Sequence, residues 1–549
     1  MNNLNYVSLT GFQMLRQYFA ILSKGCIFLL FISSLLFPGS LFGAARTALV
    51  SGNWNSIVTW GGLSVPLAGD DVTIGSGVTV TITANAACTS ITFSNNSTLS
   101  FSGAFVLDVS GTVTMPAPGN NNPITFALGA GTATIGGLFT MNGGSGNASR
   151  RNDLTISTGI LNLNGGFTTA TTRSNVIFSG AGVLNIGGTI SANPMTLTAS
   201  TGTVNYTGST AQNIWVLNYY NLGTSGTATK TCTGILTVSN ALNVDTGGTL
   251  ELSGAGTPLN YSGTISGTGK VLYSGASAQT VSSLTYHDLE FSGAGTKTLA
   301  AGTTTTVSNN WIVGSTTNMT TTAAAVVTGD ISGSGAITMG SGTLTLGGDW
   351  TNNGTFTSGT GTVVYDGITQ SIGAIPYYDL VVSNSGEKTL SASTTVSNTL
   401  TVNDPATLGL SSFTLNLPLS GTPLINTGII DPGTSTVNYA GTAETSIAPG
   451  NYYNLDGTGG DRILPDGQEV GIAGTFTPGA GAYTVTGSLV NFNGSEIQTI
   501  PAFTFNDVIL SGTGDKEIPG ATEVTVKTIE IQDGPSLDIL GDAQLNITN

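Results

Sequence analysis

A single histidine, His287, is the side chain of this sequence whose ordinary pKa lies closest to neutral, and it invites a catalytic interpretation. A single histidine is not enough for a zinc site built from several Cys and His ligands. The sequence also shows no conventional Ser-His-Asp triad around it. His287 also belongs to a repeated block, and the other copies place Tyr220, Tyr378, Tyr453 and Asn506 at its position. Because phenols and an amide replace the imidazole there, we expect His287 to have a structural role.

Carboxylates are the other groups that could catalyse a reaction, since two of them at a fixed separation can cleave a glycosidic bond. Asp288, Asp379 and Asp507 share one repeat position, which is Asn221 or Asn454 in the remaining copies. An Asn amide can cap a turn but cannot act as a general acid, so we predict a shared hydrogen-bonding or turn role for this position. The sequence therefore points to no catalytic residue.

Two further acids, Asp456 and Asp461, are the candidates for a cation site. They lie near Arg462, and pectate-lyase-like chemistry needs acidic calcium ligands near an Arg or Lys base. A glycine-containing surface turn explains the same segment. We therefore expect no cofactor, with calcium as the alternative at this turn or at Asp70-Asp71.

These candidate residues lie in or near a block that returns five times. Each copy has an aromatic residue two positions before a glycine, followed in four copies by a glutamine. An aromatic-rich cluster comes next, and a basic residue lies seven or eight positions beyond it. The block predicts a stack of similar β units. Its aromatic–glycine pairs are Tyr206 with Gly208, Tyr273 with Gly275, Tyr365 with Gly367, Tyr439 with Gly441, and Phe492 with Gly494.

Three of the aromatic clusters contain adjacent tyrosines. Neighbouring residues of a strand face opposite sides, so at most one ring of each pair is free for a ligand. Tyr220, Tyr378 and Tyr453 are the candidate ligand-binding residues, because tyrosine offers a large contact area to sugars. The alternative is that one ring of each pair packs inward on its neighbour in the next coil.

The composition favours strands joined by tight turns. Charged residues make up 8% of the chain, against about 25% in ordinary domains, and 78 of the 549 residues are glycine. Short segments alternate apolar and polar residues with a period of two, which is typical of strands. We predict an all-β fold: an elongated parallel β-helix of imperfect repeats. Its atypical first unit, with Trp54 and Trp60, is expected to form an N-terminal cap.

The chain divides into three expected regions. Residues 1–45 predict a secretory signal, because Arg16 and Lys24 precede an apolar run that small residues follow. Residues 46–150 are assigned to the cap and first coils, and residues 151–549 to the β-helix with its long repeats starting at 206, 273, 365, 439 and 492. No later apolar run approaches the roughly 18 residues of a spanning helix, so we expect a secreted protein without a membrane span.

The net charge of −16 argues against nucleic acid as a partner, since that binding needs clustered Lys and Arg. With about 22 residues per coil and strands about 4.8 Å apart, Cys88 and Cys232 lie too far apart for a disulfide. We predict that both are free thiols. The chain ends in strand-like sequence, and an uncovered last coil would allow end-to-end or edge association.

Over residues 47–549 the chain resembles the secreted bacterial β-solenoid surface proteins, which are the filamentous-haemagglutinin-like and pectin-lyase-like β-helices. The features that carry the resemblance are the signal-like start, the composition and the repeat. The resemblance implies a non-enzymatic extracellular structural or adhesive protein that presents a repetitive face to glycans, cells or matrix. A carbohydrate-active, polysaccharide-cleaving β-helix using Asp456 and Asp461 is the alternative. A minor alternative is an ice-binding solenoid with outward threonines at Thr303–Thr306 and Thr320–Thr322.

Overall fold

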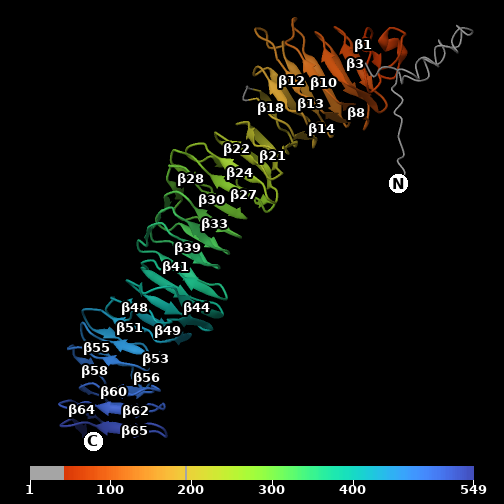
Figure 1. The fold of residues 1–549 in the computed structure, drawn as a ribbon. Coiled ribbons are helices and arrows are strands. Elements are labelled where there is room, and N and C mark those ends of the chain that lie inside the picture. The colour runs from red at the N-terminus through yellow and green to blue at the C-terminus, as the bar shows by residue number, and fades with distance from the viewer. Residues whose placement is uncertain (1–42, 192–194, 549) are drawn as a thin grey trace, which may run out of the picture. The chain divides into compact units, whose positions relative to one another are not determined.

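A computed structural model describes residues 43–191 and 195–548, and these form a parallel β-solenoid of about 24 turns (Figure 1). The predicted all-β, parallel β-helical fold is confirmed. The described chain divides into two compact units, unit 1 with residues 43–155 and 159–175, and unit 2 with residues 156–158 and 176–548. The predicted signal segment lies outside the described residues as far as residue 42.

Unit 1 stacks short strands in parallel columns. One column runs in the order β1-β3-β6-β9-β12-β15, and its neighbours contain β2-β4-β7-β10 and β5-β8-β11-β14. Each strand lies directly beside the strand one coil earlier, so inward apolar residues stack into one core. The first column comprises β1 (Ala45–Ala48), β3 (Asp71–Ile74), β6 (Ser90–Phe93), β9 (Val113–Met115), β12 (Phe139–Met141) and β15 (Phe167–Thr169). The second comprises β2 (Gly52–Asn53), β4 (Thr79–Ile82), β7 (Thr98–Phe101) and β10 (Ile124–Gly129), and the third β5 (Ala86–Cys88), β8 (Val106–Val109), β11 (Thr132–Ile135) and β14 (Ile160–Leu163).

The first coil of unit 1 carries the two tryptophans predicted for the cap. Trp54 and Trp60 are buried, with ring centroids 5.3 Å apart in an edge-to-face arrangement. The Trp60 indole donates a hydrogen bond of 2.7 Å to the Trp54 carbonyl, and Trp60 ends the short 3-10 helix η2 (Ile57–Trp60). The short helix that carries Trp60 packs beside β1 and β2.

Unit 2 continues the same construction with coils of variable length. In one of its sheets, Thr304 pairs with Ala324, 20 residues on, and Leu400 pairs with Leu424, 24 residues on. These coil lengths lie on either side of the expected length of about 22 residues. That sheet runs in the order β29-β32-β35-β38-β41-β43-β46-β49. Its strands are β29 (Thr285–Tyr286), β32 (Thr304–Val307), β35 (Ala324–Val327), β38 (Thr343–Leu346), β41 (Thr362–Tyr365), β43 (Asp379–Val382), β46 (Leu400–Val402) and β49 (Leu424–Asn426).

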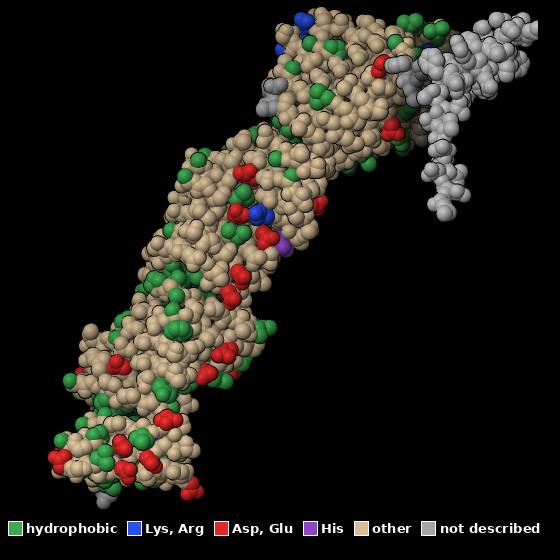
Figure 2. All heavy atoms as spheres, viewed as in Figure 1, with side chains coloured by type: hydrophobic (Ala, Val, Ile, Leu, Met, Phe, Trp, Pro, Cys, Tyr) green, Lys and Arg blue, Asp and Glu red, His purple; other side chains and the backbone are tan. Residues whose placement is uncertain are grey.

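The surface of the coils is mostly uncharged. Figure 2 shows that uncharged polar side chains and backbone make up most of the visible surface. Acidic groups gather over the C-terminal coils. Among the described residues, no helix is long and apolar enough to cross a membrane.

Candidate functional site

Two aromatic residues of each repeated block lie inside the coils. They are the aromatic residue that opens the block and the first residue of its aromatic cluster, and they face each other across the core. Tyr273 and Tyr286 are both fully buried, and their hydroxyl oxygens are 2.9 Å apart. The same contact joins the equivalent tyrosines in three other copies, at 2.8 to 2.9 Å. In the fifth copy Phe492 and Phe505 take these places and pack edge-to-face. The other hydroxyl-paired tyrosines are Tyr206 with Tyr219, Tyr365 with Tyr377, and Tyr439 with Tyr452.

Each tyrosine pair closes a hydrogen-bonded ring with one backbone unit. The Ser282 amide donates to the Tyr273 hydroxyl at 3.2 Å, and the Tyr286 hydroxyl donates to the Ser282 carbonyl at 2.7 Å. Trp215, Gly373 and Ala448 supply the backbone unit in the other three tyrosine copies. The inward ring of each adjacent pair is therefore the first one, and it is occupied by the fold.

The candidate ligand-binding tyrosines Tyr220, Tyr378 and Tyr453 are the second members of these pairs. All three are half-buried at the surface, as is His287. His287 lies with its Nδ1 atom 3.0 Å from the neighbouring Asp288 carboxylate. The strand alternation used in the sequence argument thus holds, and only the second ring of each pair reaches solvent.

The glutamine of the block bonds to backbone groups on two coils. In the second copy, Gln279 accepts the Gly275 amide at 2.9 Å and donates to the Leu252 and Gly254 carbonyls of the preceding coil at 2.8 and 2.7 Å. A Cβ atom on Gly275 would lie 2.7 Å from the Gln279 side chain, which explains the glycine. Gln212, Gln370 and Gln498 make the same set of bonds.

The basic residue of the block lies one coil after the glutamine. Gln279 pairs in register with Lys297, which is 18 residues further on. Lys297 is fully buried, and its ammonium group donates to the Gly275 and Gly295 carbonyls at 3.0 and 2.7 Å. Lys230 and Lys516 repeat this arrangement with their own glycines.

The fourth copy of the block keeps its glycine but departs from the other copies in its partners. Thr445 replaces the glutamine and pairs in register with Arg462, which replaces the lysine. A Cβ atom on Gly441 would lie 2.5 Å from the Thr445 hydroxyl oxygen, and the Gly441 carbonyl accepts the Gly460 amide at 3.0 Å. The Thr445 hydroxyl donates to the Ala443 carbonyl at 2.9 Å. Gly441 therefore has the predicted structural role through close packing, without the carboxamide acceptor that the other four glycines have.

The strands that begin with the glutamine of the block, or with Thr445 in the fourth copy, have a shared place in the topology, because each is the first strand of a new sheet. A first strand has one edge without a partner strand, although Gln279 and Thr445 each bridge one residue of the preceding coil, Gly256 and Gly421. Buried backbone groups left unpaired are costly. The glutamine carboxamide supplies hydrogen bonds to the preceding coil at that place. The repeat therefore marks positions where a sheet begins. The strands concerned are β20 (Gln212–Ile214), β28 (Gln279–Val281), β42 (Gln370–Ile372), β52 (Thr445–Ser446) and β60 (Gln498–Thr499).

Burial without a partner carboxylate lowers the pKa of Lys297 to about 8, whereas burial raises the pKa of Tyr365 and Tyr439 to about 12. Between pH 8 and the ordinary lysine range, the unfolded chain binds more protons at this lysine, so its contribution to stability rises with pH. Above about pH 10 the unfolded tyrosines lose protons that the folded ones keep, and stability falls.

We therefore expect the free energy of unfolding of the wild type, measured with denaturant, to increase between pH 8 and pH 10 relative to that of a Lys297→Met variant. The buried ammonium supplies the difference, because the variant has no group that titrates at this position. A stability difference between the two proteins that stays constant over this range would contradict a lowered lysine pKa.

The recurrent aspartates act as hydrogen-bond acceptors between coils. Asp288 accepts the Asn310 amide at 3.1 Å, and Asp379 accepts the Thr399 amide at 3.0 Å. Asn454, at the same repeat position, accepts the Thr475 amide at 2.9 Å. An amide oxygen performs this task as well as a carboxylate, which explains the Asp/Asn exchange in the sequence.

The acids proposed for a cation site do not converge with the nearby arginine. Asp456 accepts the Thr458 amide and Asp461 the Ala482 amide, each at 2.8 Å. Arg462 points to the other side of its strand, where it is buried and donates to the Tyr439 and Thr458 carbonyls. Within residues 43–191 and 195–548, no group of three or more His, Cys, Asp or Glu is placed to hold a metal ion.

Comparisons with protein-family models, with curated proteins and with solved structures found no match to this chain. Cys88 and Cys232 are both buried free thiols, as predicted.

Outward side chains form a regular column on unit 1. Consecutive strands of its first sheet place a threonine at the same outward position in six coils, paired in register. None of these hydroxyls makes a hydrogen bond within the described part of the chain. The column consists of Thr47, Thr73, Thr92, Thr114, Thr140 and Thr168.

The threonines expected to form an outward ladder in unit 2 do not form one. Thr305 is 1% exposed, and the outward Thr304 and Thr306 pair with Ala324 and Val326. Thr322 lies in a turn with a φ of 61°. The prediction for these segments was wrong because strand alternation turns every second threonine inward and the next coil does not repeat them.

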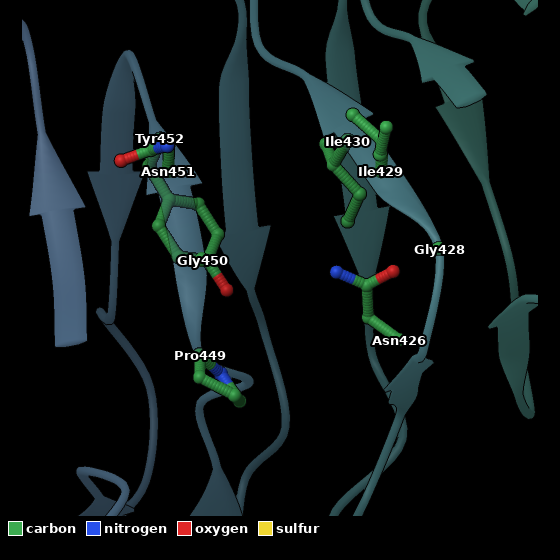
Figure 3. A pocket seen from close by; sticks show the side chains of 8 residues that line it. All are labelled: Asn426, Gly428, Ile429, Ile430, Pro449, Gly450, Asn451 and Tyr452. Carbon is green, nitrogen blue, oxygen red and sulfur yellow. The ribbon is translucent and has the colours of Figure 1, made fainter. Parts of the chain in front are cut away.

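The described surface is hollowed where the β29 to β49 sheet stops. On the next coil stands Pro449, which has no amide hydrogen and cannot continue a ladder. Strand β53 (Gly450–Tyr452) belongs to a new sheet instead. A cavity of about 180 Å³ separates Asn426 and Ile430 from Pro449 and Tyr452 (Figure 3). It adjoins a larger groove of about 530 Å³ that shares Asn426 and Pro449.

Proposed function

We propose that the protein is a non-enzymatic extracellular structural or adhesive protein, of the filamentous-haemagglutinin-like type, which presents repeated coil surfaces to glycans, cells or matrix. The observation that carries the proposal is the repetition of outward side chains in register, of which the threonine column of unit 1 is the most regular case. Weak contacts repeated along such a surface gain strength through avidity.

The use of the acidic groups supports the same proposal. Glycoside cleavage needs two carboxylates placed for proton transfer and attack. Here Asp288, Asp379, Asp456 and Asp461 are engaged by backbone amides. Secretion, and the absence of a cofactor and of nucleic-acid partners, belong to the proposal as well.

The test is a glycan array probed with the full chain, together with a polysaccharide-degradation assay. We expect binding to a subset of glycans and no depolymerisation. Depolymerisation that disappears in the Asp461→Ala variant would replace the proposal with the carbohydrate-active alternative.

Ice binding is a second candidate, which the threonine column specifically favours. Threonine is stiff at χ1, so the six methyl and hydroxyl groups are held in a regular row with the strand spacing of about 4.8 Å. Such a row of unpaired hydroxyls and methyls can order water in a fixed lattice. Charged and aromatic side chains are absent from these six positions.

The column predicts inhibition of ice recrystallisation by the wild type, and a Thr114→Lys variant is expected to lose most of that effect. Its matched control is Thr338→Lys, a change at an outward strand position of unit 2. Equal activity of the two variants, or none in the wild type, would rule out this use of the column.

A further inference from the structure

The groove beside Pro449 has an apolar floor that several coils build together. Ile447, Ala448 and Leu464 lie in the floor and are at least nine-tenths buried. Pro449 and Pro465 stand at the corner on consecutive coils. Neither proline can donate to a ladder, so the corner stays open and the floor remains accessible from one side.

Polar groups around this floor are free to bind a ligand. The Asn426 side-chain oxygen is buried and has no hydrogen-bond partner among the described residues. Figure 3 shows the Asn426 amide nitrogen on the side of the carboxamide that faces the Pro449–Tyr452 segment, with the oxygen on the opposite side. The Asp466 carboxylate and the Gln468 carboxamide, both exposed at the groove, also make no hydrogen bond within the described part of the chain.

The Asn426 amide nitrogen faces the space and can donate a hydrogen bond to a ligand oxygen. The groove thus combines an apolar surface with a few convergent hydrogen-bonding groups, which is the usual composition of a small-ligand site.

The chemistry of the lining selects the class of ligand. Carboxamides both donate and accept, and a carboxylate accepts, so Asn426, Gln468 and Asp466 suit a ligand with several hydroxyl groups. The aliphatic floor suits C–H surfaces. Asp466 is the one charged residue of the lining, and the chain is strongly acidic, so anionic ligands are disfavoured. The volume of about 530 Å³ suits roughly one or two sugar rings.

We propose that this groove binds the terminal neutral sugar of a glycan. The inference rests on the proposed adhesive function and names the ligand class and the site for it. The Asn426 amide nitrogen donates to a sugar hydroxyl from the inner end of the groove, Asp466 and Gln468 bond hydroxyls at the rim, and the Ile447–Pro449 floor packs against the ring.

The test measures the binding of methyl glycosides of neutral hexoses and deoxyhexoses to the full chain by saturation-transfer NMR and titration. We expect one or more of them to bind, Asp466→Ala to raise the dissociation constant about tenfold, and Thr486→Trp, at the groove wall, to abolish binding. Asp533→Ala, which removes an exposed acid elsewhere, is the matched control and should bind like the wild type.

The variants are compared by thermal unfolding, and all three changes lie at exposed positions. Binding that Asp466→Ala and Thr486→Trp leave unchanged would overturn the groove while leaving adhesion to glycans intact. If the full chain binds array glycans but no methyl glycoside, the groove is likewise overturned. Absence of glycan binding in both assays would overturn this inference together with the glycan part of the proposed function.

Discussion

Replacing Gln279 with leucine is expected to destabilise the surrounding coils by about 3–5 kcal/mol. Leucine is similar in size but cannot hydrogen-bond, so the Gly275 amide and the Gly254 carbonyl lose their buried partner, whereas the Leu252 carbonyl keeps the Ser274 amide. Each buried backbone group left unpaired costs about 1–3 kcal/mol. The loss is local, because each coil of a solenoid contacts mainly its neighbours.

Hydrogen exchange under native conditions measures this change as a lower opening free energy for the peptides around residues 252–254 and 273–299. Gln532→Leu serves as the control, since Gln532 is exposed and makes a single long contact of 3.4 Å to Glu530. An equal effect of the two substitutions would mean that the glutamine of the repeat contributes nothing beyond its surface area.

Removing one inner hydroxyl, in the Tyr286→Phe variant, is expected to cost about 2–3 kcal/mol. The Tyr286 hydroxyl links the Tyr273 hydroxyl to the Ser282 carbonyl. Without it the Ser282 carbonyl loses its donor and the Tyr273 hydroxyl proton loses its acceptor, although Tyr273 keeps the bond from the Ser282 amide. The rings remain packed, so the loss comes from hydrogen bonding rather than from a cavity.

Tyr220→Phe is the matched control, because Tyr220 is the half-exposed second ring of its pair and should change stability by less than about 0.5 kcal/mol. Denaturant unfolding of both variants gives the comparison. If Tyr220→Phe were the more costly change, the assignment of inner and outer rings would be reversed.

Much of the fold could be predicted from the sequence. The period of two in segments such as Val78–Ile82 set which residues face inward, and the returning block indicated stacked coils. The Asp/Asn exchange at position 288 correctly predicted a hydrogen-bonding role, which the Asn310 amide now explains. These features depend on local alternation and on repetition, and both patterns can be recognised in the sequence alone.

Other features depend on contacts between coils and were missed. The 18-residue offset between Gln279 and Lys297 is one coil length, and it was the available signal that these side chains share a site. Conversely, the threonine runs near residues 303 and 320 are local, whereas the column containing Thr92 and Thr114 needs the register of separate strands. The groove beside Pro449 required knowing which ladder that proline interrupts.

The central claim is that the repeated block is a buried structural element in which each copy begins a new sheet, so that ligands meet only the outward residues. Residue-resolved amide exchange at the block glycines Gly208, Gly275, Gly367 and Gly494 tests it most directly, since each donates its amide to a glutamine. The account predicts that these four amides exchange as slowly as core strand amides, with and without glycans. Fast exchange at these glycines in the free protein, or protection that appears only when a glycan is bound, would contradict it.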